Sequence, residues 1–146
     1  KLDTDPAALT GNHAVVSNYS GLGGRAWILE TTNTDVTWFW ASSASGTLQS
    51  LTTTGITLVL GGEYRICVDK DATGTIRIYV DGVMYAKDTP ADSAITASNP
   101  GTGVVVGRQV SQQFNGYVEE LRISKGVARY ASDSGYTVSA TKFPRK

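Results

Sequence analysis

Hydrophobic and polar residues alternate along most of this chain, the pattern of β-strands that bury one face. The alternation predicts strands at 14–19, 26–30, 35–41, 47–53, 56–60, 63–69, 75–80, 83–87, 104–108 and 117–124. Turns rich in glycine, serine and asparagine separate these segments, and stripes of helical period are absent. Many short strands at such spacing predict an all-β sandwich or barrel.

Residues 63–69 and 75–80 form the clearest predicted hairpin. Ile66 and Val68 alternate with polar neighbours on the first strand, and Ile76 and Ile78 do so on the second. Asp81-Gly82 then supplies a two-residue turn into the next strand, because glycine adopts positive φ at little cost. We therefore expect three consecutive antiparallel strands here, with the isoleucines facing the core.

The aromatic cluster at 38–40 indicates which face of another strand is buried. Trp38 and Trp40 share one face with Val36, whereas Phe39 takes the other face. We expect the two tryptophans to belong to the core.

Length and composition narrow the range of functions. The chain has 146 residues, which fits one domain over 1–146, and its 16 glycines suit a turn-rich β fold. Thirteen basic residues balance thirteen acidic ones, so no basic surface for nucleic acid is expected. The single cysteine, Cys67, excludes an internal disulfide. No apolar run approaches the ~20 residues of a membrane helix, so membrane insertion is not expected.

Three segments carry a resemblance to a known family. They are Ile78-Tyr79-Val80-Asp81-Gly82, then Val106-Gly107-Arg108, then Phe114-Asn115-Gly116-Tyr117-Val118-Glu119-Glu120-Leu121-Arg122-Ile123. From about Asn12 to Tyr130 the chain resembles the laminin G-like, concanavalin A-like lectin-glucanase domain, an antiparallel jelly-roll sandwich of two sheets. Its continuation from Ser124 to Tyr130 is similar to the versions in bacteriophage tail and structural proteins.

The resemblance implies one further strand at the start of the domain. Lys1 to Gly11 does not match it, so either another chain supplies this strand or the chain is a fragment of a longer one. A sheet edge left open in this way invites pairing with a neighbouring strand.

Catalysis is not expected. A glycosidase needs two carboxylates that face each other across the sugar. Glu119 and Glu120 are adjacent on a predicted strand, so they point to opposite faces, and His13 is the only histidine on which a triad could depend.

Ligand-binding candidates come from one sheet face and from loops. Arg65, Arg77 and Tyr79 lie opposite the isoleucine face of the predicted hairpin, and Asn18, Tyr19 and Arg25 flank a glycine-rich turn. Aromatic rings that stack on sugars, with polar partners for the hydroxyls, are the chemistry expected of a carbohydrate site. A solvated or partner-covered sheet face is the alternative interpretation.

Calcium is the one cofactor that the sequence suggests. Asp69 and Asp71 begin a segment with oxygen ligands at alternate positions and Gly74 in sixth place, but the distal glutamate of a calcium loop is missing. Turn formation is the competing interpretation. In some relatives a carboxylate at the position of Glu119 binds a structural calcium.

These observations predict that the protein is a non-catalytic binding module, a phage structural or tail-associated domain that contacts carbohydrate. The alternative is a purely architectural virion domain for decoration or oligomerisation. The expected partners are carbohydrate or a neighbouring virion protein, in a homo-oligomer or larger assembly. The expected location is the virion, or the cytoplasm before assembly, with an extracellular location as the alternative.

Overall fold

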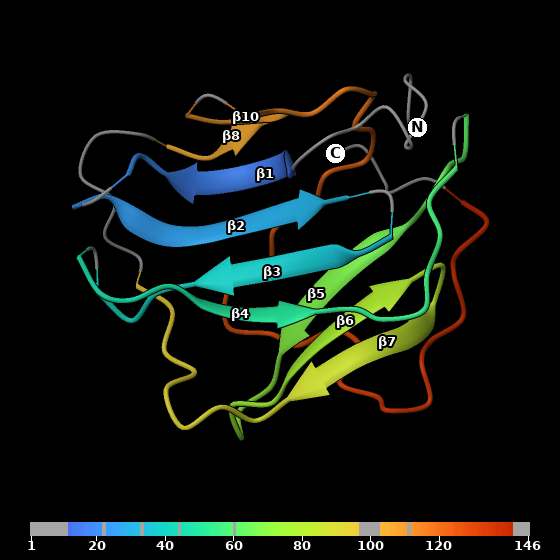
Figure 1. Cartoon of the computed structure of the whole chain (residues 1–146). Helices are drawn as coiled ribbons and strands as arrows, with labels where there is room; N and C mark the ends of the chain where they lie inside the picture. Colours follow the sequence, from blue (N-terminus) through green and yellow to red (C-terminus); the bar gives the residue numbers. More distant parts are fainter. Residues whose placement is uncertain are drawn as a thin grey trace.

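The fold is built from antiparallel β-strands (Figure 1). The computed structural model describes residues 12–21, 23–32, 34–43, 45–59, 61–96, 103–110 and 112–141. Within these residues there is no helix, and every strand pairing is antiparallel. The segment from 1 to 11, where the first strand of the family was expected to be missing, lies outside the described residues.

The larger sheet has five strands in the order β4-β3-β2-β1-β8. They span Gln49–Thr52 (β4), Val36–Trp40 (β3), Arg25–Thr31 (β2), His13–Tyr19 (β1) and Val105–Val106 (β8). A short ribbon of β9 (Arg108–Gln109) and β10 (Gln112–Gln113) lies beside β1. Two contacts hold it there: Ser17 Oγ donates to the Arg108 carbonyl at 2.9 Å, and His13 Nδ1 lies 2.8 Å from the Gln113 carbonyl.

The smaller sheet has the order β5-β6-β7, spanning Ile66–Lys70, Ile76–Val80 and Val83–Asp88. It confirms the predicted run of three antiparallel strands. Asp81 and Gly82 form the turn between β6 and β7 with φ values of 50° and 84°, as such a turn requires.

The core lies between the two sheets. The larger sheet contributes Val16, Leu29 and Val36, and the smaller sheet contributes Ile78 and Val80. The rings of Trp27 and Trp38 stack at 5.5 Å beside this cluster, and Trp40 is buried. The prediction that Val36, Trp38 and Trp40 face the core is therefore confirmed, and the two packed antiparallel sheets form the predicted sandwich.

The outer face of the smaller sheet is covered by residues 130–136, which we call the C-terminal strap. Tyr79 is 0% exposed, and its ring makes edge contacts with Tyr130 and Tyr136 of the strap. Its hydroxyl donates to the Ser132 carbonyl at 3.1 Å and accepts from the Ser132 amide at 3.2 Å. The strap therefore packs on this face as part of the fold.

Two charged side chains of the same face, Asp69 and Arg77, also contact the strap. Asp69 Oδ2 accepts the backbone amides of Tyr130 and Ala131 at 3.2 and 2.8 Å. Arg77, itself buried, pairs with Asp71 and Asp133, both at 2.7 Å. Because its partners are two carboxylates, the guanidinium is neutralised where water is largely excluded.

The predicted strand at 117–124 is wrong. The described residues contain no strand there, and Glu120 adopts a φ of 57°, which interrupts an extended backbone. Tyr117 and Ile123 are 62% and 56% exposed rather than enclosed between the sheets. The strand expected at 56–60 is also absent over 56–59, although Ile56 and Leu58 still reach the core from a loop.

Candidate functional site: a pocket on the outer face of the larger sheet

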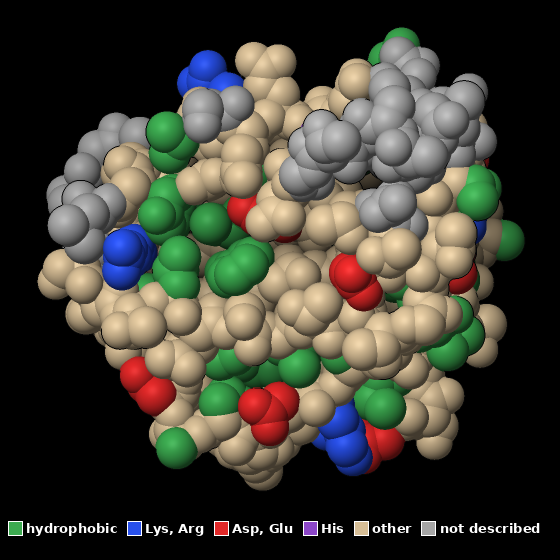
Figure 2. Space-filling model, in the orientation of Figure 1, with side chains coloured by type: hydrophobic (Ala, Val, Ile, Leu, Met, Phe, Trp, Pro, Cys, Tyr) green, Lys and Arg blue, Asp and Glu red, His purple; other side chains and the backbone are tan. Residues whose placement is uncertain are grey.

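A pocket of about 410 Å³ lies on the face of the larger sheet that points away from the smaller one. Figure 2 shows hydrophobic side chains gathered over β1, β2 and β3 on this face, beside acidic ones. The pocket combines apolar, amide and acidic groups; its lining residues are Asn12, Tyr19, Gly21, Ile28, Glu30, Phe39, Leu48, Gln109, Val110 and Gln112.

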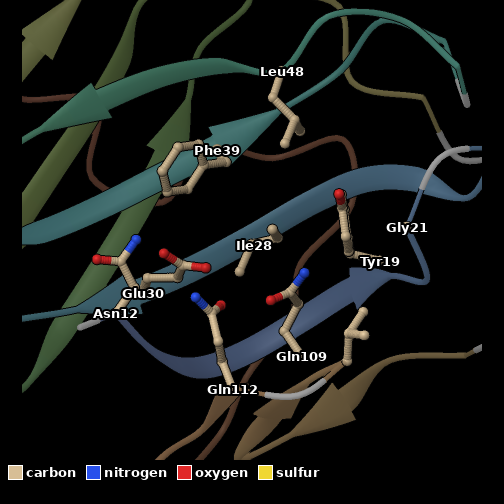
Figure 3. A pocket seen from close by; sticks show the side chains of 10 residues that line it. Asn12, Tyr19, Gly21, Ile28, Glu30, Phe39, Leu48, Gln109 and Gln112 are labelled. Carbon is tan, nitrogen blue, oxygen red and sulfur yellow. The ribbon is translucent and has the colours of Figure 1, made fainter. Parts of the chain in front are cut away.

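The strand register explains why these residues meet. Trp27 and Leu29 of β2 face the core, so Ile28 and Glu30, at the alternate positions, face outward. Ile28 lies opposite Phe39 in the pairing of β2 with β3. Ile28 therefore forms the floor of the pocket, with Phe39 beside it (Figure 3).

One wall of the pocket comes from the β9–β10 ribbon. Gln109 and Gln112 extend from this ribbon. The amide of Gln112 points toward Glu30 and Asn12, and the amide of Gln109 lies near Ile28 (Figure 3). Val110 takes a φ of 46° in the intervening turn, so the chain reverses within a few residues. The amides of both strands consequently face the same hollow.

Glu30 is the chemically distinctive residue of the pocket. It is only 4% exposed, and its Oε2 has no hydrogen-bond partner in the described part of the chain. Burial raises the pKa of its carboxyl, while a hydrogen bond with Asn12 and the nearby His13 act in the opposite direction. A buried acceptor without a donor is costly, so Glu30 is positioned to accept a hydrogen bond from a ligand.

The raised pKa of Glu30 predicts a pH dependence of stability. Folding favours the protonated acid, so its stabilising effect is complete below the ordinary pKa of 4.5 and is lost as pH rises through the folded-state pKa. Glu30→Gln should therefore gain stability relative to the wild type across this window and keep the gain at higher pH. Urea unfolding from pH 3.5 to 8 measures it, with the exposed Glu63→Gln as control. A difference that stays constant with pH would contradict the assignment.

Of the three loop residues predicted to bind ligand, one lines the pocket and two do not. Tyr19 lines the pocket. Asn18 pairs with the core residue Trp27, and its Oδ1 is buried without a hydrogen-bond partner in the described residues. Arg25 donates to the Gly46 carbonyl at 2.7 Å and is not among the pocket residues.

The sheet residues predicted to bind ligand lie on the opposite side of the molecule. Arg77 and Tyr79 are beneath the strap, where a ligand would reach their polar atoms only by displacing it. Arg65 is exposed on the other side, where its backbone amide donates to Asp81 Oδ1 at 2.8 Å and its carbonyl accepts the Asp81 amide at 2.9 Å. The structure therefore does not bring these three residues into the pocket.

The carboxylates considered for calcium have other partners. Asp71 accepts the hydroxyl of Thr73 at 2.6 Å, pairs with Arg77, and accepts the amides of Thr75 and Thr73 at 3.1 and 2.9 Å. These contacts hold the pKa of its carboxyl well below its ordinary value. Asp69 binds the strap, and Glu119 is exposed on a different segment. The described residues contain no group of three or more His, Cys, Asp or Glu side chains placed to hold a metal. The geometry favours turn formation at Asp69–Gly74.

Cys67 is not placed for nucleophilic chemistry. Burial raises the pKa of its thiol to about 12, and the nearby Asp69 acts in the same direction. The thiolate is the reactive form, so this thiol is unreactive at neutral pH.

Sequence reasoning did not select Glu30, Phe39, Gln109 or Gln112 as site residues. For the first two, a signal was present. Alternation places Phe39 on the strand face that points away from the core tryptophans, and it places Glu30 on the face that points away from Leu29. For the two glutamines, only the fold of the ribbon against β1 reveals the site, because nothing in their local sequence indicates it.

Comparison with protein families agrees with this architecture. A model described as the concanavalin A-like lectin/glucanases superfamily, laminin G type, matches residues 4–132. The chain belongs to this superfamily. Searches among curated proteins and among solved structures found no match.

Domains of this superfamily often bind carbohydrate, and the laminin G-like, lectin-type fold is generally non-catalytic. The superfamily's description nevertheless covers both lectins, which bind sugars, and glucanases, which hydrolyse them. Membership alone therefore does not decide between binding and hydrolysis. A search for membrane-spanning helices found none in the described residues.

Proposed function

We propose that this protein is a non-catalytic carbohydrate-binding domain whose ligand occupies the outer-face pocket. The observation that carries the proposal is the convergence of Phe39, Glu30 and the amides of Gln109 and Gln112 around one hollow. Glu30 Oε2 has no hydrogen-bond partner among the described residues. Its volume of about 410 Å³ lies within the range of small-ligand pockets.

Each group matches a part of a sugar. A pyranose has apolar C–H faces, which pack against Phe39 and the Ile28 floor. Its hydroxyls are donors and acceptors in fixed directions, and side-chain amides offer both functions. Glu30 Oε2 would gain the donor that it lacks, which makes its hydrogen bond to a hydroxyl worth more than that of a solvated carboxylate.

The absence of a second acid supports binding without hydrolysis. Both common mechanisms of glycoside hydrolysis use a pair of carboxyl groups about 5–10 Å apart. Glu30 is the only acidic side chain among the described residues that line the pocket. From these described residues, a sugar held here would meet one carboxylate and no partner acid.

A virion setting is supported by the likeness of Ser124 to Tyr130 to phage structural domains. Many copies on one particle would strengthen weak single-site binding through multivalency, with no need for a deeper pocket.

Phe39→Ala is the direct test of the pocket. Removing the ring takes away the apolar surface on which the sugar packs, worth about 1.5 kcal/mol or more, so affinity should fall at least about tenfold. A glycan array finds the ligand, and calorimetry with the best hit measures the change. Tyr85→Ala, which truncates a partly exposed aromatic residue on β7, is the matched control and should bind as the wild type does.

Unchanged affinity in Phe39→Ala would contradict the location of the site. No wild-type binding to any printed glycan would contradict the proposed function itself. That result would favour the architectural interpretation, with the exposed Tyr117, Ile123 and Val127 as its candidate contact surface.

A further inference from the structure

A second, smaller hollow adjoins the pocket. It measures about 170 Å³ and is lined by Ser17, Tyr19, Ser20, Val105, Arg108, Gln109 and Val110. Tyr19, Gln109 and Val110 line both hollows, so these three residues stand between them. The two hollows are therefore neighbouring parts of one surface.

The two hollows differ in charge. Among the described lining residues, Glu30 is the only charged one in the larger hollow, and Arg108 is the only charged one in the smaller. Arg108 is exposed, and the ion pairs of the described residues involve only Arg77 and Lys87 as cations. Its guanidinium is therefore available to an anion from solution, for which its planar donor fork is suited.

The smaller hollow is below the volume usual for a complete ligand. It fits a substituent or one part of a sugar whose neighbour occupies the larger pocket. The carboxylate of Glu30 repels an anionic group from the larger pocket, and Arg108 attracts it to the smaller one. The charges thus set both the class of ligand and its orientation.

We propose that the two hollows together bind an acidic oligosaccharide, with a neutral sugar beside Phe39 and Glu30 and the anionic group of the adjoining sugar on Arg108. This inference rests on the proposed function and adds the class of glycan. A uronic acid carboxylate and a sulfate ester share the anion chemistry that Arg108 recognises.

The test uses an array of disaccharides of glucose, galactose and N-acetylglucosamine, each printed in three forms: neutral, with the terminal sugar as its uronic acid where one exists, and with a terminal sulfate. The wild type should bind at least one acidic form about fivefold more tightly than its neutral counterpart, as expected for an exposed ion pair with good geometry. The preference should shrink as NaCl rises from 50 to 500 mM, because salt screens exposed charges.

Arg108→Gln should remove the preference and retain the affinity for the neutral form. Arg65→Gln makes the same charge change at an exposed site outside both hollows and should leave the preference intact. Which acidic form is preferred distinguishes the carboxylate from the sulfate source.

Neutral binding without any acidic preference, or a preference that survives in Arg108→Gln, would overturn this inference and leave the proposed function standing. Loss of neutral binding in Arg108→Gln, with the fold intact by circular dichroism, would also overturn it. Failure of the wild type to bind any form would overturn both proposals.

Discussion

Tyr79→Ala is expected to lower the free energy of unfolding by about 3–5 kcal/mol, the range for truncating a large aromatic side chain in a packed interior. Tyr79 is fully buried, and its ring touches both Tyr130 and Tyr136 of the strap. The substitution leaves a cavity beneath the strap and removes the hydroxyl that binds both backbone groups of Ser132. Urea unfolding measures the loss.

Two further variants separate the contributions. Tyr79→Phe keeps the ring and removes only the hydroxyl, which should cost about 1–2 kcal/mol because the partly buried backbone groups of Ser132 lose their partner. Tyr85→Ala truncates a partly exposed tyrosine of the next strand and should cost less than about 1 kcal/mol. A loss below about 1 kcal/mol in Tyr79→Ala would mean that the strap does not pack on this face in solution.

Measuring both the stability and the glycan binding of Tyr79→Ala decides the role of Tyr79. If it contacts a sugar, as its place opposite the isoleucines suggested, its truncation should weaken glycan binding with little change in stability. If it holds the strap, stability should fall first. The structure gives its ring and hydroxyl partners within the chain, so we expect the second result.

Local alternation was enough to predict the strands whose partners are close in sequence. The hairpins around β6 and the orientation of Val36, Trp38 and Trp40 follow from it, because each side chain must choose between core and solvent. The same rule failed at 117–124, where apolar residues alternate but the backbone turns at Glu120 and leaves Ile123 exposed. Alternation indicates a strand only where a neighbouring strand is available to pair with it.

The candidate site was harder to predict for a related reason. Glu30 and Phe39 face outward by alternation, yet an outward position alone indicates solvent. The pocket exists because a ribbon about 80 residues later in the chain folds beside β1 and supplies Gln109 and Gln112. Conversely, Arg77 and Tyr79 also face outward, and a distant segment buries them. Segments remote in sequence therefore decide which outward-facing residues remain accessible.

Gly82→Ala tests the contact between the β6–β7 turn and the strap. A Cβ at this position would clash with the Tyr136 carbonyl oxygen, and the Gly82 carbonyl accepts the Tyr136 amide at 2.8 Å. Alanine would also be held at a φ of +84°. Strain and clash together should cost about 2–4 kcal/mol, because the obstructing atom belongs to the backbone and relief requires the strap to move.

Gly61→Ala is the matched control, because Gly61 has a similar φ of +74° and open space where the Cβ would lie. It should show only the conformational strain, about 1 kcal/mol. The excess loss in Gly82→Ala then measures the close approach of the strap to the turn, and it should disappear in a Tyr79→Ala background, where the strap is already displaced. Equal losses in the two glycine variants would show that the strap does not press against Gly82.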